Sequence, residues 1–187
     1  MIMFTCNTIA VTYRKLCTRP FLEQIDRVLK QKPVGLILRE KDLSWEDYAA
    51  LAKQVISLCQ AAGVSCYLNG FPRAGEQLGH PWLQLSFPLL LEYGRPKGTQ
   101  RLGISVHSVE EAVRAQQLGA DFLMAGHIFP TGCKPGLPPR GLEFLQQVCQ
   151  AATIPVYAIG GITPDNAPLA IQAGAEGVCI MSGAMQL

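Results

Sequence analysis

Eight short runs of β-branched and aliphatic residues recur along the 187-residue sequence, and stretches with helical character separate them. The runs are apolar on successive residues, which is typical of strands covered on both faces, as in a parallel sheet. We expect strands at residues 8–12, 35–38, 65–68, 83–85, 101–106, 122–125, 156–159 and 178–181. Eight strands that alternate with helices predict one α/β domain over residues 1–187, a (β/α)8 TIM barrel, with a doubly wound sheet as the alternative.

Helix boundaries in the sequence support this order of elements. Cap residues precede three of the helical stretches, at Ser44, Ser108 and Thr163. Ser108 stands three residues before Glu111, which is the spacing of a capping box, and Pro164 suits the first turn of a helix capped by Thr163. Glycines that can end a helix precede three of the strands, at Gly63, Gly119 and Gly174.

Two parts of the chain depart from the regular pattern. Between residues 70 and 96, prolines at 72, 81, 88 and 96 leave room only for short helices. The sequence stops six residues after Met181, so the helix that should follow the last strand is missing or only begun. A barrel without that helix leaves apolar wall exposed, and a homodimer is one expected way to cover it.

The composition is that of a folded protein without a nucleic-acid partner. Hydrophobic residues make up 49% of the chain and charged residues 16%, which excludes a disordered segment and favours a well-buried α/β fold. The formal net charge is +2, and the basic residues are scattered rather than gathered into a stripe with aromatic residues.

Cysteine usage and hydropathy indicate a cytoplasmic protein. The seven cysteines are odd in number and form no Cys-x-x-Cys pair, which argues against a disulfide framework and a zinc site. No apolar run reaches the roughly 20 residues of a membrane span, and the N-terminus lacks the basic region and cleavage site of a signal peptide. We therefore expect no membrane partner.

Polar residues and glycines follow six of the expected strands, at the end where barrels place their functional residues. They are Arg39, Glu40, Lys41, Asn69, Gly70, His107, His127, Gly160, Gly161, Ser182 and Gly183. Because the carboxyl ends of parallel strands converge on one face, these residues predict a single shared site.

Two turns in this set indicate a phosphate site. Gly160-Gly161 follow the seventh strand and Ser182-Gly183 follow the eighth, and in barrels these two loops usually hold phosphate. Glycines let backbone N–H groups approach an anion, and a helix that starts at Thr163 would add the positive end of its dipole. The alternative is that both segments are only tight turns between a strand and a helix.

His127 is the candidate for proton transfer. It follows the sixth strand and precedes a segment rich in glycine and proline, residues 128–141, that we expect to lie over the site. An imidazole near neutral pKa can accept and return a proton at cellular pH. The alternative is a loop histidine that bonds a backbone carbonyl. His107 is expected to have a structural or supporting role, and His80 to be a turn residue.

The neighbouring charged and thiol side chains are open to two interpretations. Lys134 could reach a phosphate or carboxylate from the loop, or could be an ordinary solvated lysine. Arg39 and Lys41 could clamp an anion or lie at the rim, and Arg39 is the nearer to its strand. Cys133 has no base placed by the sequence to activate it, so we expect a bystander thiol.

Six segments of the sequence carry a resemblance to a known family. They are LILREK at 36–41, LNG at 68–70, GISVHSVEEA at 103–112, AGHIFPTGCKPGLPPRGL at 125–142, IPVYAIGGITPDN at 154–166 and GVCIMSGA at 177–184. Together they resemble the thiamine phosphate synthase superfamily, and specifically its thiazole tautomerase (TenI) branch, over nearly the whole chain.

The chain departs from the synthases of this superfamily where they handle pyrophosphate. By resemblance, a synthase has Gln in place of Ile37, Asn-Asp in place of Asn69-Gly70, and a carboxylate near the end of the fourth strand, where residues 85–89 have none. Its loop reads Thr-x-Thr-Lys, against Thr131-Gly132-Cys133-Lys134 here. Because Mg²⁺ binds oxygen ligands, above all carboxylates, these departures argue against metal-dependent pyrophosphate chemistry.

Gly126-His127 resembles the tautomerase branch, since the synthases usually have Gly-Pro there. The resemblance implies a thiazole phosphate substrate of thiamine biosynthesis: the non-aromatic carboxythiazole phosphate tautomer becomes 2-(2-carboxy-4-methylthiazol-5-yl)ethyl phosphate. His127 would move a proton from ring carbon two to the exocyclic alkene carbon, with no metal and no organic cofactor. The expected substrate contacts are Arg39, Lys41, Asn69, Ser105, Thr131, Lys134, Gly160, Gly161, Ser182 and Gly183.

Two other functions stay open at this point. The chain could be a thiamine phosphate synthase, which joins hydroxymethylpyrimidine pyrophosphate and thiazole phosphate. It could also be a non-catalytic relative that keeps the phosphate cradle as a ligand sensor or regulator.

Overall fold

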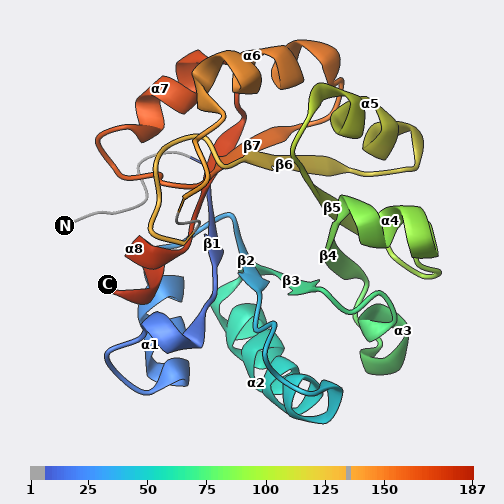
Figure 1. The fold of residues 1–187 in the computed structure, drawn as a ribbon. Coiled ribbons are helices and arrows are strands. Elements are labelled where there is room, and N and C mark those ends of the chain that lie inside the picture. Colours follow the sequence, from blue (N-terminus) through green and yellow to red (C-terminus); the bar gives the residue numbers. More distant parts are fainter. Residues whose placement is uncertain (1–6, 134–135) are drawn as a thin grey trace.

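The chain closes eight parallel strands into a barrel, seen in Figure 1; the computed structural model describes residues 7–133 and 136–187. The strands are β1 (Thr8–Val11), β2 (Gly35–Leu38), β3 (Ser65–Asn69), β4 (Trp82–Ser86), β5 (Arg101–Val106), β6 (Phe122–Gly126), β7 (Val156–Ile159) and β8 (Gly177–Ile180). Each strand pairs with the next in sequence, and β8 pairs with β1, so the sheet has no free edge. The predicted (β/α)8 barrel is confirmed.

Helices follow the strands and surround the barrel (Figure 1). They are the 3-10 turn η1 (Arg14–Leu16), α1 (Phe21–Leu29), α2 (Trp45–Ala62), α3 (Ala74–Leu78), α4 (Phe87–Tyr93), α5 (Val109–Gln117), α6 (Gly141–Ala151), α7 (Ala167–Gln172) and α8 (Ser182–Met185). The proline-rich segment contains only the short helices α3 and α4, as the sequence predicts.

A short helix, α8, follows the last strand, so the expected helix is present in part. α8 has four residues, and its Ala184 and Met185 are fully buried. The side chain of Gln24 in α1 donates a hydrogen bond of 2.7 Å to the carbonyl of Ala184. This short helix therefore covers part of the barrel wall, and the expected homodimer stays a prediction.

Two helices begin at the expected caps. The hydroxyl of Ser44 accepts from the backbone N–H of Asp47 at the start of α2, and that of Ser108 accepts from Glu111 at the start of α5, each at 3.1 Å. Gly63 ends α2 in the left-handed conformation, with φ of 69°. Each cap satisfies backbone groups that a helix end leaves without partners inside the helix.

The expected cap of the seventh helix forms at Thr163. Thr163 N–H donates to Asn166 Oδ1 at 2.8 Å, and Asn166 N–H donates to Thr163 Oγ1 at 3.4 Å, which is the reciprocal pattern of a capping box. Ala167 N–H donates to the Thr163 carbonyl at 2.9 Å, as in the first turn of a helix. The regular helix α7 begins at Ala167, three residues beyond Pro164.

Aromatic rings fill the interior of the barrel below the strand ends. Side chains alternate along each strand between the interior and the layer under the helices. The ring of Phe122 lies with its centroid 5.2 Å from that of Tyr67 and 5.8 Å from that of Tyr157. Gly103 makes room for it, since a Cβ there would lie 2.2 Å from Phe122 Cζ.

Membrane insertion finds no support in the helices. Across residues 7–133 and 136–187, none of them combines the length and the apolarity that a membrane span requires.

Candidate active site

A cavity of about 880 Å³ opens at the carboxyl ends of the strands. Glu40 does not line it, but the other described residues predicted for the site do, namely Arg39, Lys41, Asn69, Gly70, Ser105, His107, His127, Thr131, Gly160, Gly161, Ser182 and Gly183. Lys134 lies outside the described residues. The strand-end rule therefore gathers the described candidates into one place, as the sequence predicts.

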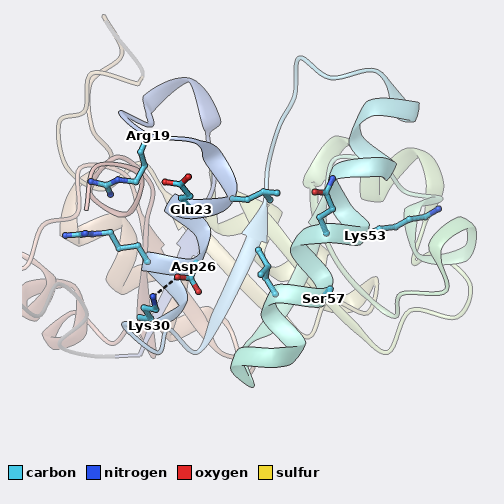
Figure 2. Close-up of a pocket in the computed structure, with 10 residues that line it drawn as sticks. Arg19, Glu23, Asp26, Lys30, Lys53 and Ser57 are labelled. Atoms are coloured by element: carbon cyan, nitrogen blue, oxygen red, sulfur yellow. Dashed lines mark ion pairs between the residues drawn. The ribbon is translucent and has the colours of Figure 1, made fainter.

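A second hollow, of about 1030 Å³, lies outside the barrel between α1 and α2 (Figure 2). Its walls carry charges of both signs, and Lys30 pairs with Asp26 of the same helix at 2.7 Å. No histidine, no cysteine and no predicted site residue lies among its lining residues. The cavity at the strand ends is therefore the candidate site.

His127 lies in the wall of this cavity and is 6% exposed. It follows β6 directly, after a cis peptide bond that joins it to Gly126. Its Nε2 lies 3.3 Å from the carbonyl oxygen of Leu137. A carbonyl can only accept, so Nε2 carries a hydrogen and Nδ1 is the ring nitrogen that could accept a proton. The ring thus bonds a backbone carbonyl, as one interpretation expects, and also lines the cavity, while proton transfer stays a prediction.

The backbone around His127 is held by the neighbouring strand and by the loop. Ile128 N–H donates to the carbonyl of Ile159 at 3.0 Å, and Arg140 N–H donates to that of His127 at 2.9 Å. A Cβ at Gly160 would lie 2.3 Å from the Cβ of His127. The glycine that the sequence assigns to a phosphate cradle is thus also needed for packing against the histidine.

The loop after β6 reaches across the mouth of the cavity to β8. Residues 130–133 line the cavity, and Cys133 Sγ lies 3.6 Å from the hydroxyl of Ser182. The described part of this loop therefore forms one wall of the cavity, and its role as a cover stays a prediction. Among the described residues, Cys133 bonds the hydroxyls of Ser182 and Thr131, neither of which is a base, and its role as a bystander thiol stays a prediction. Burial raises the pKa of the other thiol in the wall, Cys179, and keeps it uncharged.

Arg39 and Lys41 bring positive charge to the cavity, while Glu40 between them turns the other way. Buried Glu40 accepts hydrogen bonds from Thr12 Oγ1 at 2.7 Å and from Arg14 N–H at 3.0 Å. Thr12 Oγ1 in turn accepts from Arg39 N–H at 2.9 Å. Glu40 thus fixes the start of the segment that carries the two cations.

Glu40→Ala is expected to lower the free energy of unfolding by about 3 kcal/mol, because the Thr12 hydroxyl and the Arg14 N–H lose their buried acceptor. Chemical denaturation measures this change. Glu46→Ala, at an exposed position on α2, is the matched control and should stay within about 0.5 kcal/mol of the unmodified protein. Equal changes in the free energy of unfolding for the two substitutions would show that Glu40 does not fix this segment.

A row of polar side chains on β3, β4 and β5 was only partly predicted. Asn69 Nδ2 donates to the side chain and, at 3.2 Å, to the backbone carbonyl of Gln84, and Gln84 Nε2 donates to Ser105 Oγ at 2.8 Å. Asn69 Oδ1 is buried and has no hydrogen-bond partner among the described residues. Gln84 and Ser86 are the residues that sequence reasoning missed. A polar residue between Leu83 and Leu85 was the available signal, since alternation turns it inward.

The chain matches a known protein family over nearly its whole length. The family model for thiamine monophosphate synthase (TMP-TENI) matches residues 8–184. The chain belongs to the thiamine monophosphate synthase family. The predicted superfamily is thereby confirmed, and with it a place among enzymes of thiamine biosynthesis.

Relatives within the thiamine monophosphate synthase family are similar along most of their length. A thiamine-phosphate synthase of Chlorobium luteolum is 35% identical over 169 residues, covering 86% of this chain and 78% of the relative. One of Moorella thermoacetica is 34% identical over 172 residues, covering 88% and 80%. The solved thiamine phosphate pyrophosphorylase from Pyrococcus furiosus has a TM-score of 0.82 and 27% identity, and the match covers 96% of this chain and 87% of that one. The first two are named as synthases and the third as a pyrophosphorylase, and none of the three as a tautomerase.

The synthases of this family are expected to hold Mg²⁺ with carboxylates, and the residues present do not fit that ion. Among the described residues that line the cavity there is no Asp and no Glu. Across the described part of the chain, no group of three His, Cys, Asp or Glu side chains could hold a metal ion. Hard cations need oxygen ligands of this kind. With Arg39 and Lys41 in its wall, the cavity instead suits an anionic ligand.

Proposed function

We propose that this member of the thiamine monophosphate synthase family is a thiazole tautomerase. The observation that carries the proposal is His127, an imidazole whose Nε2 lies 3.3 Å from the Leu137 carbonyl, in a cavity with two cations and no carboxylate among its described lining residues. Proton transfer needs a group of this kind, whereas pyrophosphate displacement needs a metal site.

The two ends of the substrate fit the charges of the cavity. Backbone N–H groups at Gly160, Gly161 and Gly183 and the hydroxyl of Ser182 suit the phosphate, because loops after β7 and β8 hold phosphate in many barrels. The substrate carboxylate suits Arg39 from β2 or Lys134 from the loop. Anchoring both ends orients the ring between them and lowers the entropic cost of the reaction.

His127 then performs the isomerisation in two proton transfers. Its Nδ1 removes the proton from ring carbon two, so that this C–H bond breaks and its electron pair delocalises toward the exocyclic carbon. The resulting imidazolium returns the proton to that carbon, where a new C–H bond forms and the ring becomes aromatic. The histidine ends in its starting state, and no electron acceptor is needed.

Thiamine phosphate synthase is the second candidate, and the names of the relatives favour it. Against it stand Ile37, Gly70 and the carboxylate-free end of β4, which replace the residues expected of a synthase. We rank it below the tautomerase for this reason.

A parallel assay on the purified protein tests the choice. One reaction contains the non-aromatic carboxythiazole phosphate and follows aromatisation by proton NMR above the uncatalysed rate. The other contains hydroxymethylpyrimidine pyrophosphate, thiazole phosphate and Mg²⁺, and follows pyrophosphate release. We expect isomerisation alone. Pyrophosphate release without isomerisation would make the protein a synthase, and binding of the aromatic phosphate without either reaction would make it a sensor.

A further inference from the structure

His107 lies beside His127 in the wall of the same cavity, although neither the proton transfer nor the phosphate cradle uses it. It follows β5, which pairs with β6 in a register that sets Val106 opposite Ala125. The next residues along the two strands, His107 and Gly126, therefore lie side by side. The Nδ1 of His107 is 2.8 Å from the carbonyl oxygen of Gly126.

The direction of this hydrogen bond follows from its partners. The Gly126 carbonyl can only accept, so Nδ1 of His107 carries the hydrogen and donates it. The backbone of His107 is fixed as well, because its N–H donates to Glu111 Oε2 at 2.6 Å. Glu111 is itself fixed by a cap bond, since its N–H donates to the hydroxyl of Ser108 at 3.1 Å. The imidazole is thus a hydrogen-bond donor, and the first turn of α5 fixes the backbone that carries it.

The carbonyl that His107 holds belongs to the peptide group that leads into His127. Gly126 offers no side chain to hold, and a Cβ there would lie 2.4 Å from the carbonyl oxygen of Ile159. On the other side of the histidine, its own carbonyl is held by Arg140 N–H, and Ile128 N–H is held by Ile159. His107 supplies the corresponding hydrogen bond before the histidine, so the backbone on both sides of His127 has a fixed orientation.

We propose that His107 is a positioning residue for His127, which deepens the proposed function and rests on it. By holding the Gly126 carbonyl, it fixes the direction in which the Cα–Cβ bond of His127 enters the cavity, and hence the place of Nδ1. A general base misplaced by about 1 Å can lose about 100-fold in rate. His107 acts through its Nδ1–H and carries no proton of the reaction.

Two substitutions at this position separate a hydrogen-bond donor from a proton carrier. In His107→Asn, the amide nitrogen stands as many bonds from the backbone as Nδ1 does and can donate to Gly126. In His107→Ala, the donor is lost. We expect kcat to fall about 10- to 100-fold in His107→Ala with KM within about threefold, and to recover in His107→Asn. His80→Ala is the matched control, because His80 is a half-buried histidine that bonds the Cys66 carbonyl at 2.7 Å outside the cavity.

The ring signals of His127 give a readout that does not depend on turnover. In protein with ¹⁵N-labelled histidine, the signals assigned to His127 should shift in His107→Ala and stay in place in His107→Asn and His80→Ala. Unchanged signals in His107→Ala, or full turnover in that variant, would overturn the proposal. Failure of His107→Asn to recover turnover would also overturn it, since His107 would then carry a proton. An unmodified protein without isomerase activity would instead refute the proposed function, while the NMR result still decides the positioning.

Discussion

His127→Ala is expected to slow isomerisation by about 10² to 10⁴-fold, the range that a positioned acid–base group contributes. The reason is that the cavity offers no carboxylate among its described lining residues to take over as the base. Binding of the aromatic product should change little, because the glycine turns and Arg39 stay in place. Steady-state kinetics with the non-aromatic substrate and calorimetric titration with the product measure the two quantities.

The control for this substitution is again His80→Ala, which removes a half-buried imidazole outside the cavity. It should leave both turnover and product affinity unchanged. Retained turnover in His127→Ala would remove the imidazole from the mechanism. A loss of product affinity equal to the loss of turnover would mean that the ring serves binding, through its bond to the Leu137 carbonyl of the loop.

The fold could be predicted because each of its eight strands is buried on both faces. Runs such as Gly35–Leu38 and Phe122–Gly126 are apolar throughout, and in the barrel both of their faces are covered. The cap of α7 could be predicted as well, because Thr163 and Pro164 have the residue types of a helix start and Thr163 exchanges hydrogen bonds with Asn166. The first residue of the regular helix, Ala167, could not be predicted from the cap, because Pro168 has no N–H to continue the helical bonds.

The site could be predicted to the extent that it follows from strand ends. His127, Gly160 and Ser182 each come directly after a strand or one residue beyond it, so the topology alone brings them into one cavity. Gln84 was not predicted as a site residue because it lies inside a strand, where a polar residue is visible only as a break in an apolar run. The hydrogen bond between His107 and Gly126 could not be predicted, because it depends on the register of two neighbouring strands, which the sequence does not reveal.

Gly160→Ala is expected to lower the free energy of unfolding by about 3 kcal/mol and to slow isomerisation by about 100-fold. Two causes add up at this position. The backbone has φ of 100°, which an L side chain rarely adopts, and the new Cβ would lie 2.3 Å from the Cβ and 2.8 Å from the Cα of His127. Relief of this contact must displace the histidine. Chemical denaturation and steady-state kinetics measure the two effects.

Gly98→Ala separates the two causes, because Gly98 has φ of 78° but no atom within 4 Å of an added Cβ. It should cost about 1 kcal/mol from backbone strain alone and leave turnover unchanged. Equal effects of the two substitutions would show that His127 does not need the space at Gly160. Alanine at position 160 also keeps the backbone N–H that a phosphate would bind. A fall in turnover with product affinity preserved would therefore mean that the glycine serves the placement of His127 more than the phosphate.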